Sequence, residues 1–317
     1  MSDSTIHHIA IIGTGAMGRG IAQDFAVAGF QVALHDISEE QLRQALTGIR
    51  RDLERQADWG LIARDRIEPA LARLRPAASL AEAAADADLV IEAVFEDLGL
   101  KRRVFAELDR VCPMHTIVGS NTSSFMPSLL AANTTRPERM LVVHYFYPPP
   151  LMPLVEIVPG PLTAPAVIES VYAAVKAAGK TPVIARKEAM GFIVNRLQMA
   201  LLREAYHLIE QGICTAAEVD LATVNSFGRR LAVVGPLELA EVQDGWDVQW
   251  EINRHIFPDL STAAGPSPVI QAQIERKDLG PRTGRGFYDW PSARLETWTT
   301  RLQAALAESL RKDRQGR

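Results

Sequence analysis

A glycine-rich turn near the N-terminus constrains this chain more than any other feature. The segment IAIIGTGAMGRG, residues 9–20, opens with β-branched apolar residues and then carries Gly13, Gly15 and Gly18 in G-x-G-x-x-G spacing. This spacing predicts a strand, a tight turn at Gly13, and a helix from Met17 to about Ala28 that packs closely at Gly18. Free backbone N–H groups and the positive dipole at such a helix start predict a phosphate site.

The residues after this helix indicate that the phosphates belong to a dinucleotide. A second apolar strand, Gln31–Leu34, follows the helix. Asp36 stands at the end of that strand, ~20 residues beyond the glycines, where a carboxylate can bind a ribose 2′-hydroxyl. The same carboxylate would repel a 2′-phosphate, and no arginine follows it directly. We therefore expect NAD rather than NADP. A chance glycine pattern is the alternative, but it leaves the strand and the acid unexplained.

Composition and charge exclude several classes of protein. The chain has 317 residues, of which 47% are hydrophobic and 23% charged, and a net charge of −4. It therefore has the length of two globular domains and no general attraction to nucleic acid or to an anionic membrane. Without an apolar run of membrane-spanning length or a basic leader, we expect a cytoplasmic protein. Cys112 and Cys214 lack metal-ligand spacing, so we expect no metal site.

Apolar strands alternate with helices through the first half of the chain. The expected elements after Asp36 are two helices within Ser38–Leu74, a helix Leu80–Ala87, a strand Asp88–Val94, a helix Leu100–Val111 and a strand Thr116–Gly119. This alternation is typical of a mostly parallel sheet with helices on both faces. Ligands of such sheets collect at the carboxyl ends of the strands.

Polar residues follow two of these predicted strands. Glu96 follows the third strand, and Lys101 lies about one helix turn later. The turn Ser120–Ser124, with sequence SNTSS, follows the fourth strand. Such a turn could serve only as a helix cap. Because the neighbouring strand ends are predicted to form a nucleotide site, we favour a direct role there for one of its residues.

Two apolar strands, Met140–Tyr147 and Leu154–Val158, form a second focus of the sequence. The proline-rich connection between them is too short for a crossover helix, so the strands are predicted to run antiparallel. If they pair symmetrically about Pro150, His144 faces Glu156. A carboxylate beside an imidazole fixes its tautomer and increases its basicity, as a general base requires. A buried histidine bonded to a structural acid is the alternative.

The alternation of strands and helices ends near Lys187, after a last short strand Thr181–Ala185. From there the pattern is helical, with interruptions by glycine and proline. We predict a nucleotide-binding domain over residues 1–187 and an all-helical C-terminal domain over residues 188–317. The predicted fold class is α/β: a Rossmann-type doubly wound sheet, mostly parallel with one antiparallel strand pair, plus the helical domain.

Two long helices are predicted in the C-terminal domain. Residues Gly191–Gln211 are apolar on more than one face, as expected of a helix at the centre of a bundle or in a subunit contact. Residues Ser292–Lys312 form a charged amphipathic helix. We expect this last helix at the surface or in an interface.

The predicted helix Leu42–Gly60 is locally basic within an acidic protein. A solvated helix face laced with acidic residues is the simplest interpretation, and a site for an anionic substrate tail is the functional one. At i, i+4 spacing, Arg51 and Arg55 share one face. Arg50 lies beside Glu54 at the same spacing and is expected to be engaged there. We therefore name Arg51 and Arg55 as candidate substrate-tail ligands.

Taken together, these motifs resemble the L-3-hydroxyacyl-CoA dehydrogenase family over the chain to Trp290. The resembling segments are GTGAMGRGIA, DLVIEAVFEDLGLK, SNTSS, HYFYPPPLMPLVEIV, GFIVNRL and KDLGPRTGRGFYDW. The resemblance implies an N-terminal NAD domain, a helical domain that forms a homodimer, and substrate in the cleft between the domains. It also implies NAD-dependent oxidation of a short-chain L-3-hydroxyacyl-CoA to the 3-ketoacyl-CoA, a reaction of fatty-acid metabolism.

The same resemblance implies roles for individual residues. The family's catalytic pair falls on His144 as proton acceptor and Glu156 as its orienting carboxylate. Its substrate-positioning residues fall on Ser123 and Asn195. Its cofactor contacts fall on Gly13, Thr14, Gly15, Ala16, Met17, Gly18, Asp36, Glu96, Lys101, Ser123 and Arg282. In the implied reaction His144 takes the hydroxyl proton while NAD accepts the hydride.

The chain departs from the family pattern at several places. Tyr147 replaces an asparagine near the nicotinamide end of the site, and Arg282 replaces a lysine. Asp52 and Trp59 stand where family members place a serine and a lysine for the CoA phosphates, and a C-terminal helix continues past Trp290. In that extension, and in the segments LVEIVPGPLTAP and GRRLAVVGPLE, the chain resembles lambda-crystallin and L-gulonate 3-dehydrogenase. These relatives oxidise hydroxy acids that carry no CoA group.

Two alternative functions remain at this point. One is an NAD-dependent dehydrogenase of a free 3-hydroxy acid, which differs from the thioester enzyme only in the substrate tail. The other is a dinucleotide-binding protein without catalysis. Dinucleotide binding alone requires neither the pair His144 and Glu156 nor the substrate-positioning residues Ser123 and Asn195. The sequence therefore favours an enzyme that acts on a small molecule.

Overall fold

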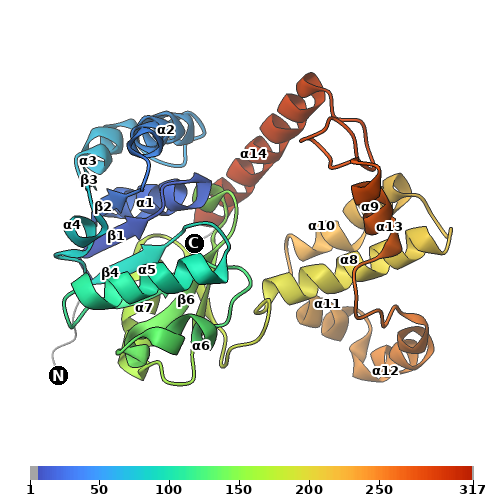
Figure 1. Cartoon of the computed structure of the whole chain (residues 1–317). Coiled ribbons are helices and arrows are strands. Elements are labelled where there is room, and N and C mark those ends of the chain that lie inside the picture. The colour runs from blue at the N-terminus through green and yellow to red at the C-terminus, as the bar shows by residue number, and fades with distance from the viewer. Residues whose placement is uncertain (1–5, 316–317) are drawn as a thin grey trace. The chain divides into compact units, whose positions relative to one another are not determined.

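The N-terminal part of the chain is built on one eight-stranded sheet (Figure 1). The computed structural model describes residues 6–315. By their contacts, residues up to Asn195 and from Thr300 onward form one compact unit, and Arg196–Thr299 form a second. The strands are β1 His8–Ile12, β2 Gln31–His35, β3 Leu74–Pro76, β4 Leu89–Glu92, β5 Ile117–Ser120, β6 Met140–Tyr145, β7 Leu154–Pro159 and β8 Thr181–Ile184.

The strand order confirms the predicted α/β fold class. The order is β3-β2-β1-β4-β5-β6-β7-β8, and all neighbours run parallel except β6 and β7. The strand order reverses between β1 and β4. In doubly wound sheets, ligands bind outside the carboxyl ends of the strands at this reversal, which here lies beside the glycine turn.

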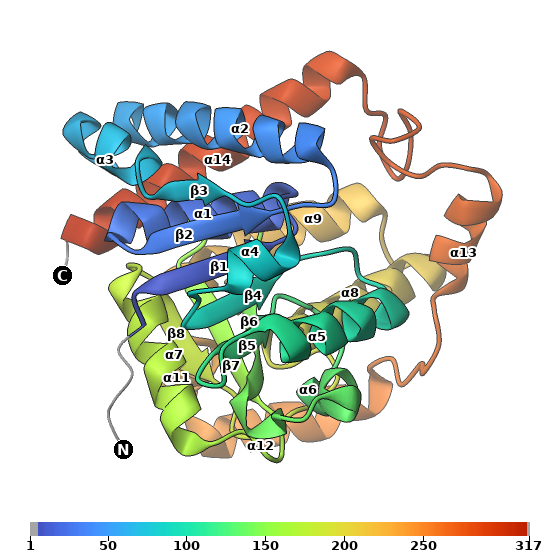
Figure 2. The same cartoon turned by 60° about the vertical axis from the view of Figure 1, so that its left-hand side comes forward.

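Helices cover both faces of the sheet (Figure 2). They are α1 Ala16–Ala28, α2 Glu39–Asp58, α3 Ile67–Leu71, α4 Leu80–Ala84, α5 Leu98–Val111, α6 Pro127–Leu130 and α7 Pro165–Ala177. One apolar core joins α1, α2 and α7 to the sheet, with Phe25 and Val171 fully buried in it. A second core on the opposite face contains Leu108 of α5 and Ala84 of α4. The doubly wound arrangement therefore buries both faces of the central strands.

Local chemistry determines where α2 begins. The Ser38 hydroxyl accepts the backbone N–H of Gln41 at 3.2 Å. Glu39 and Glu40 lie in the first turn, where negative charge interacts favourably with the helix dipole. A serine cap followed by acidic residues fixes the helix start, and α2 consequently presents a constant set of side chains to α1.

The β6–β7 pair has the predicted antiparallel register. Leu141 pairs with Pro159 at one end of the ladder and Tyr145 with Val155 at the other, so that His144 stands opposite Glu156. The connection between the strands is a short 3₁₀ turn, Pro149–Leu151. Because side chains of paired residues lie on the same face of a sheet, this register brings the histidine and the glutamate together.

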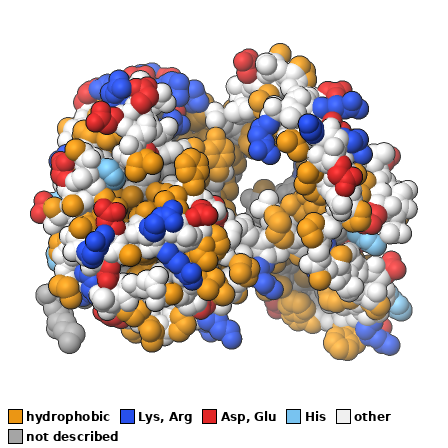
Figure 3. Space-filling view, in the orientation of Figure 1, with side chains coloured by type: hydrophobic (Ala, Val, Ile, Leu, Met, Phe, Trp, Pro, Cys, Tyr) orange, Lys and Arg blue, Asp and Glu red, His pale blue; other side chains and the backbone are white. Residues whose placement is uncertain are grey.

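The second unit is helical. The helices from this region to the end of the described chain are α8 Val194–Glu210, α9 Ala216–Asn225, α10 Phe227–Leu231, α11 Pro236–Gln243, α12 Gly245–Ile256, α13 Pro268–Glu275 and α14 Ser292–Gln315. Within Arg196–Thr299, all of which is described, Ala205 is the only buried residue. Large apolar side chains lie at the surface of this unit (Figure 3), among them Trp246 and Trp250.

The last part of α14 belongs to the N-terminal unit. Ala307 and Leu310 form an apolar cluster with Leu61 and Leu151, and Arg314 donates a hydrogen bond to the Leu61 carbonyl. By contacts, residues 188–195 and Thr300 onward therefore group with the sheet, whereas the sequence assigned them to the helical domain. The division near residue 187 stays a prediction.

The helices show no candidate for a membrane span. None of those described between residues 6 and 315 combines the length and the apolar character that crossing a bilayer requires.

Candidate active site

The turn between β1 and α1 depends on two of its glycines. Gly13 has a φ of +92°, a conformation that residues with a side chain rarely adopt. A Cβ at Gly18 would lie 1.8 Å from the Gly13 carbonyl oxygen, so α1 reaches the turn only with glycine there. At Gly15, by contrast, no atom of the described chain lies within 4 Å of the Cβ position. The space beside Gly15 is therefore open to a ligand.

Asp36 lies against this turn. One oxygen, Oδ2, accepts the Thr14 backbone N–H at 2.8 Å and the Thr14 hydroxyl at 3.1 Å. The other, Oδ1, accepts the Ser38 backbone N–H at 3.0 Å. These bonds fix the carboxylate at the carboxyl end of β2, beside the second residue of the glycine turn, where it can reach the ribose of a dinucleotide.

A buried ion pair lies beneath the next two strand ends. Lys101 Nζ is 2.8 Å from Glu92 Oε1 and 3.3 Å from Glu96 Oε2. Ser120 donates to the other Glu92 oxygen at 2.6 Å. The sequence interpretation missed Glu92, although a glutamate inside the apolar strand DLVIEAV was an available signal. Lys101 is only 1% exposed, and the less buried Glu96 is the partner that connects it to the surface of the site. The predicted contact of Lys101 with the cofactor stays a prediction.

Glu96 organises the serine-rich turn after β5. Its Oε1 accepts the Thr122 hydroxyl and the backbone N–H groups of Ser123 and Ser124, the latter two at 3.2 Å. Burial acts to raise the pKa of Glu96, but the hydrogen bond from Thr122 and the charge of Lys101 outweigh burial and hold the pKa below its ordinary value of 4.5. An ionised Glu96 therefore holds Ser123 in place.

The same turn is tied to β6 and to the start of α8. Asn121 Oδ1 accepts the Tyr145 backbone N–H at 2.8 Å. Asn195 donates from Nδ2 to the Ser123 carbonyl at 3.1 Å. The two residues predicted to position the substrate, Ser123 and Asn195, are thus in direct contact, and the turn is tied to the strand that carries His144.

His144 and Glu156 form a buried pair. The distance from His144 Nδ1 to Glu156 Oε2 is 2.8 Å, and the exposed fractions of the two residues are 5% and 0%. The second oxygen, Oε1, accepts the backbone N–H groups of Ile193 and Val194, each at 2.9 Å. Val194 begins α8, so the carboxylate also lies at the positive end of a helix dipole.

These contacts set the charge and the tautomer of the pair. Burial acts to raise the pKa of Glu156, but hydrogen bonds from His144, Val194 and Ile193 hold it below its ordinary value of 4.5. With Nδ1–H donating to an ionised carboxylate, Nε2 is the basic nitrogen. The imidazole is further oriented by Phe146, whose ring centroid lies 4.4 Å away. The pair is therefore arranged to accept a proton at Nε2.

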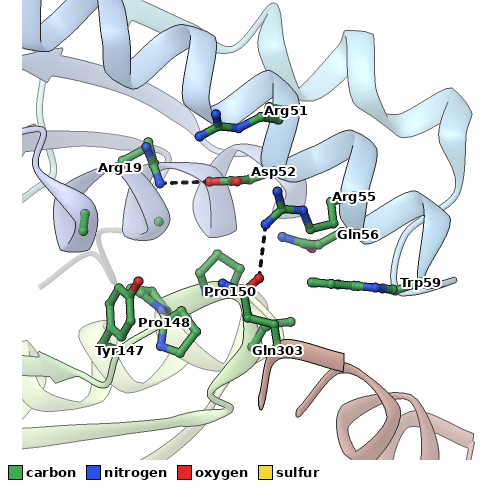
Figure 4. A pocket seen from close by; sticks show the side chains of 14 residues that line it. Arg19, Arg51, Asp52, Arg55, Gln56, Trp59, Tyr147, Pro148, Pro150 and Gln303 are labelled. Atoms are coloured by element: carbon green, nitrogen blue, oxygen red, sulfur yellow. Dashed lines mark hydrogen bonds and ion pairs between the residues drawn. The ribbon is translucent and has the colours of Figure 1, made fainter. Parts of the chain in front are cut away.

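A pocket of approximately 210 Å³ lies next to the glycine turn, entirely within the N-terminal unit (Figure 4). Its walls come from α1, α2, the proline-rich connection after β6, and α14. The polar and aromatic lining residues include Arg19, Arg51, Asp52, Arg55, Gln56, Trp59, Tyr147 and Gln303. Both predicted substrate-tail residues, Arg51 and Arg55, therefore line one pocket. Three of the positions at which the sequence departs from the family pattern, Asp52, Trp59 and Tyr147, line it as well.

The arginines of α2 differ from one another in their contacts. Arg50 forms its ion pair with Glu68 of α3 at 2.5 Å. Glu54, the partner predicted from helix spacing, contributes only a weaker electrostatic interaction. Arg19 of α1, which the sequence interpretation missed, lies 3.2 Å from Asp52. The Asp52 charge is thereby neutralised, and the pocket remains positively charged.

Two further predicted features lie outside this arrangement. Arg282 belongs to the second unit, where its side chain is exposed, and its contact with the cofactor stays a prediction. Cys112 and Cys214 are both free thiols. Among residues 6–315, no three His, Cys, Asp or Glu side chains gather so as to hold a metal ion.

Both parts of the chain match domains of one known enzyme family. Residues 8–189 match the NAD-binding domain of 3-hydroxyacyl-CoA dehydrogenase, and residues 191–290 match the C-terminal domain of the same enzyme. The chain belongs to the 3-hydroxyacyl-CoA dehydrogenase family. It is an NAD-dependent oxidoreductase. The family match ends before α14, so this helix is an addition to the family domain.

Individual relatives differ in the compounds that their names contain. The human lambda-crystallin homolog is 38% identical over 239 residues, 75% of this chain and 75% of that protein. The probable 3-hydroxybutyryl-CoA dehydrogenase of Bacillus subtilis (strain 168) is 34% identical over 286 residues, 90% of this chain and 98% of that protein. The crystal structure of 5-formyl-3-hydroxy-2-methylpyridine 4-carboxylic acid 5-dehydrogenase, an NAD+ dependent dismutase, superimposes with a TM-score of 0.90 at 29% identity, covering 98% of this chain and 99% of that one.

The glycine turn allows binding and stability to be tested separately. Gly18→Ala is expected to lower the free energy of unfolding by about 1–3 kcal/mol, because the new methyl group meets the Gly13 carbonyl. Gly15→Ala is the matched control: it should change that free energy by less than about 0.5 kcal/mol, yet weaken NADH binding, because its methyl group enters the open space. Urea unfolding and NADH fluorescence titration measure the two effects. Equal destabilisation by both variants would contradict this account of the turn.

Proposed function

We propose that this protein oxidises the hydroxyl group of an L-3-hydroxyacyl compound with NAD, using His144 as the general base. The observation that carries the proposal is the buried 2.8 Å contact between His144 Nδ1 and Glu156 Oε2. Nε2 takes the hydroxyl proton of the substrate as the hydride leaves the carbinol carbon. Glu156, ionised and held by two backbone N–H groups, stabilises the imidazolium that forms.

The strand ends around the glycine turn suit the dinucleotide. NAD supplies the hydride acceptor when bound. The residues of the turn, Gly13–Gly18, would hold its pyrophosphate in the open space beside Gly15, and Asp36 would bind the adenosine ribose. Glu96 and Ser123 would meet the cofactor at the neighbouring strand ends. The donors and the open space in this part of the structure fit such a ligand.

Ser123 and Asn195 are proposed to position the substrate. Their contact links the serine-rich turn to the start of α8, beside the backbone N–H groups that bind Glu156. A hydroxyl and an amide held in this way can orient the oxygens of an acyl group without titrating. Positioning of this kind contributes to rate through fixed geometry rather than through proton transfer.

Two forms of the substrate are compatible with this chemistry. The family and the Bacillus relative are named for CoA thioesters, which the sequence analysis also favoured. The pyridine carboxylic acid dehydrogenase is named for a small acid, and its similarity extends over 98% of this chain, whereas the family match ends at residue 290. The reaction at the carbinol carbon is the same for both forms.

We also propose that the protein is a cytoplasmic homodimer whose helical units meet. In the single chain, Trp246, Trp250 and Phe257 of that unit are 54%, 65% and 61% exposed. Apolar exposure on this scale is a feature of surfaces that associate. Sedimentation equilibrium of the full chain should give twice the mass of one chain, and a monomer at micromolar concentration would contradict the proposal.

Substitution of the proposed base should abolish most of the activity. His144→Ala is expected to lower kcat for NAD-dependent oxidation by ~10²–10⁴-fold, the usual contribution of a general base. Glu156→Gln should lose less, because the imidazole remains present but is less well oriented. NADH affinity should survive both changes, and His115→Ala serves as a control at a solvent-exposed histidine. Near-normal turnover in His144→Ala would overturn the proposed mechanism.

A further inference from the structure

Four consecutive residues at the start of α8, residues 192–195, each contact part of the candidate site. The ring of Phe192 lies against the imidazole of His144. The next two residues donate their backbone N–H groups to Glu156, and the Asn195 amide donates to the serine-rich turn after β5. All four residues belong to the N-terminal unit. The conformation of this short segment therefore affects the proposed base, its carboxylate and the proposed substrate-positioning pair together.

The backbone of this segment has an unusual conformation. Phe192 has a φ of +53°, and Gly191 before it has a φ of +75°. Glycine adopts positive φ freely, whereas a side chain makes it unfavourable. Among residues 6–315, Lys277 is the one other residue besides glycine with positive φ. It follows the C-terminal cap of α13, where left-handed residues are common. Phe192 precedes a helix, so capping does not explain its conformation.

The contacts of the Phe192 ring explain why a side chain is present at this position. The residue is 3% exposed. Its ring centroid lies 5.6 Å from that of His144, with the two ring planes inclined by 62°, which is a favourable edge-to-face arrangement. Phe146 also contacts the imidazole, but it belongs to the same segment as the histidine. The contact from Phe192 instead connects the imidazole to the turn that binds Glu156.

We propose that Phe192 is a positioning residue for the oxidation. Its left-handed backbone directs the two N–H groups that follow toward Glu156, and its ring holds the imidazole of His144 in one orientation. This inference rests on the proposed function, because Phe192 acts through the same base. Unfavourable backbone conformations persist where the surrounding contacts require them, and they concentrate at functional sites. Packing in the apolar core of this face is the alternative role, and it requires no effect on catalysis.

A pair of leucine variants of the full-length protein separates positioning from packing. Phe192→Leu keeps an apolar side chain but loses the planar ring. It is expected to lower the single-turnover rate of NADH formation by about 10–100-fold, because small misplacements of a catalytic group are costly. The KM for NAD should change by less than about twofold, since the cofactor contacts are retained. The substrate is L-3-hydroxybutyrate or its CoA thioester, whichever the parent oxidises faster.

Phe105→Leu is the matched control. Phe105 is 2% exposed and belongs to the same apolar core, on α5. Its replacement should lower the urea midpoint as Phe192→Leu does, yet leave the single-turnover rate within about twofold of the parent, because the ring contacts no proposed catalytic group. NADH fluorescence titration verifies that each variant is folded and binds the cofactor.

Two smaller replacements test the backbone conformation. Phe192→Gly and Phe192→Ala both remove the ring, but only glycine adopts positive φ without strain. The glycine variant is therefore expected to have a urea midpoint at least as high as the alanine variant, and both should be as slow in single turnover as Phe192→Leu or slower. A higher midpoint for the alanine variant would contradict the role given to the backbone.

The outcomes also separate this inference from the proposed function. A parent-like rate in Phe192→Leu, or an equal loss of rate in Phe105→Leu, would overturn the positioning role while a large loss in His144→Ala still supported the proposed function. Failure of the parent to oxidise either compound, with NADH binding retained, would overturn the proposed function itself and this inference with it.

Discussion

The candidate site depends on a carboxylate that is fully removed from solvent. Each oxygen of Glu156 has partners: His144 on one side, and two backbone N–H groups at the start of α8 on the other. Loss of a partner would leave a buried charge uncompensated, at a cost of about 3–5 kcal/mol. The register of β6 on β7, the start of α8 and the orientation of the imidazole are therefore coupled through one side chain.

A second buried pair stabilises the opposite side of the site. Lys101 and Glu92 lie at 1% and 0% exposure beneath the ends of β4 and β5. Through Glu96 the same lysine is connected to the serine-rich turn, and through Ser123 that turn contacts Asn195. Two ionic contacts inside an apolar sheet thus hold the groups that would surround a substrate, and neither contact itself requires a ligand.

The features that the sequence predicted correctly are those determined by residues close together in the chain. The glycine turn follows from steric limits on two residues, Gly13 and Gly18. The position of His144 opposite Glu156 follows from a short connection that is symmetric about Pro150. These patterns are complete within a few residues, and they predicted the fold class and the register correctly. The strand β3 was missed because its three residues, Leu74–Pro76, are largely exposed and show no alternation.

Contacts between segments that are distant in the sequence could not be predicted in this way. Arg50 pairs with Glu68 rather than with Glu54, because helix spacing gives the neighbours on one helix but not those on the next. The contact of α14 with Arg55 through Gln303 could not be predicted from the sequence either. An amphipathic pattern shows that one face of a helix is buried, but it does not show which element buries that face.

The acid-base role of His144 can be measured from the pH dependence of oxidation at saturating NAD. A general base must be unprotonated to accept the hydroxyl proton, so kcat/KM for the unaltered protein should fall on the acid side of its pH optimum. In His144→Gln the residual rate should lack this decline. The same acid-side decline in the variant would show that another group accepts the proton and would contradict the account.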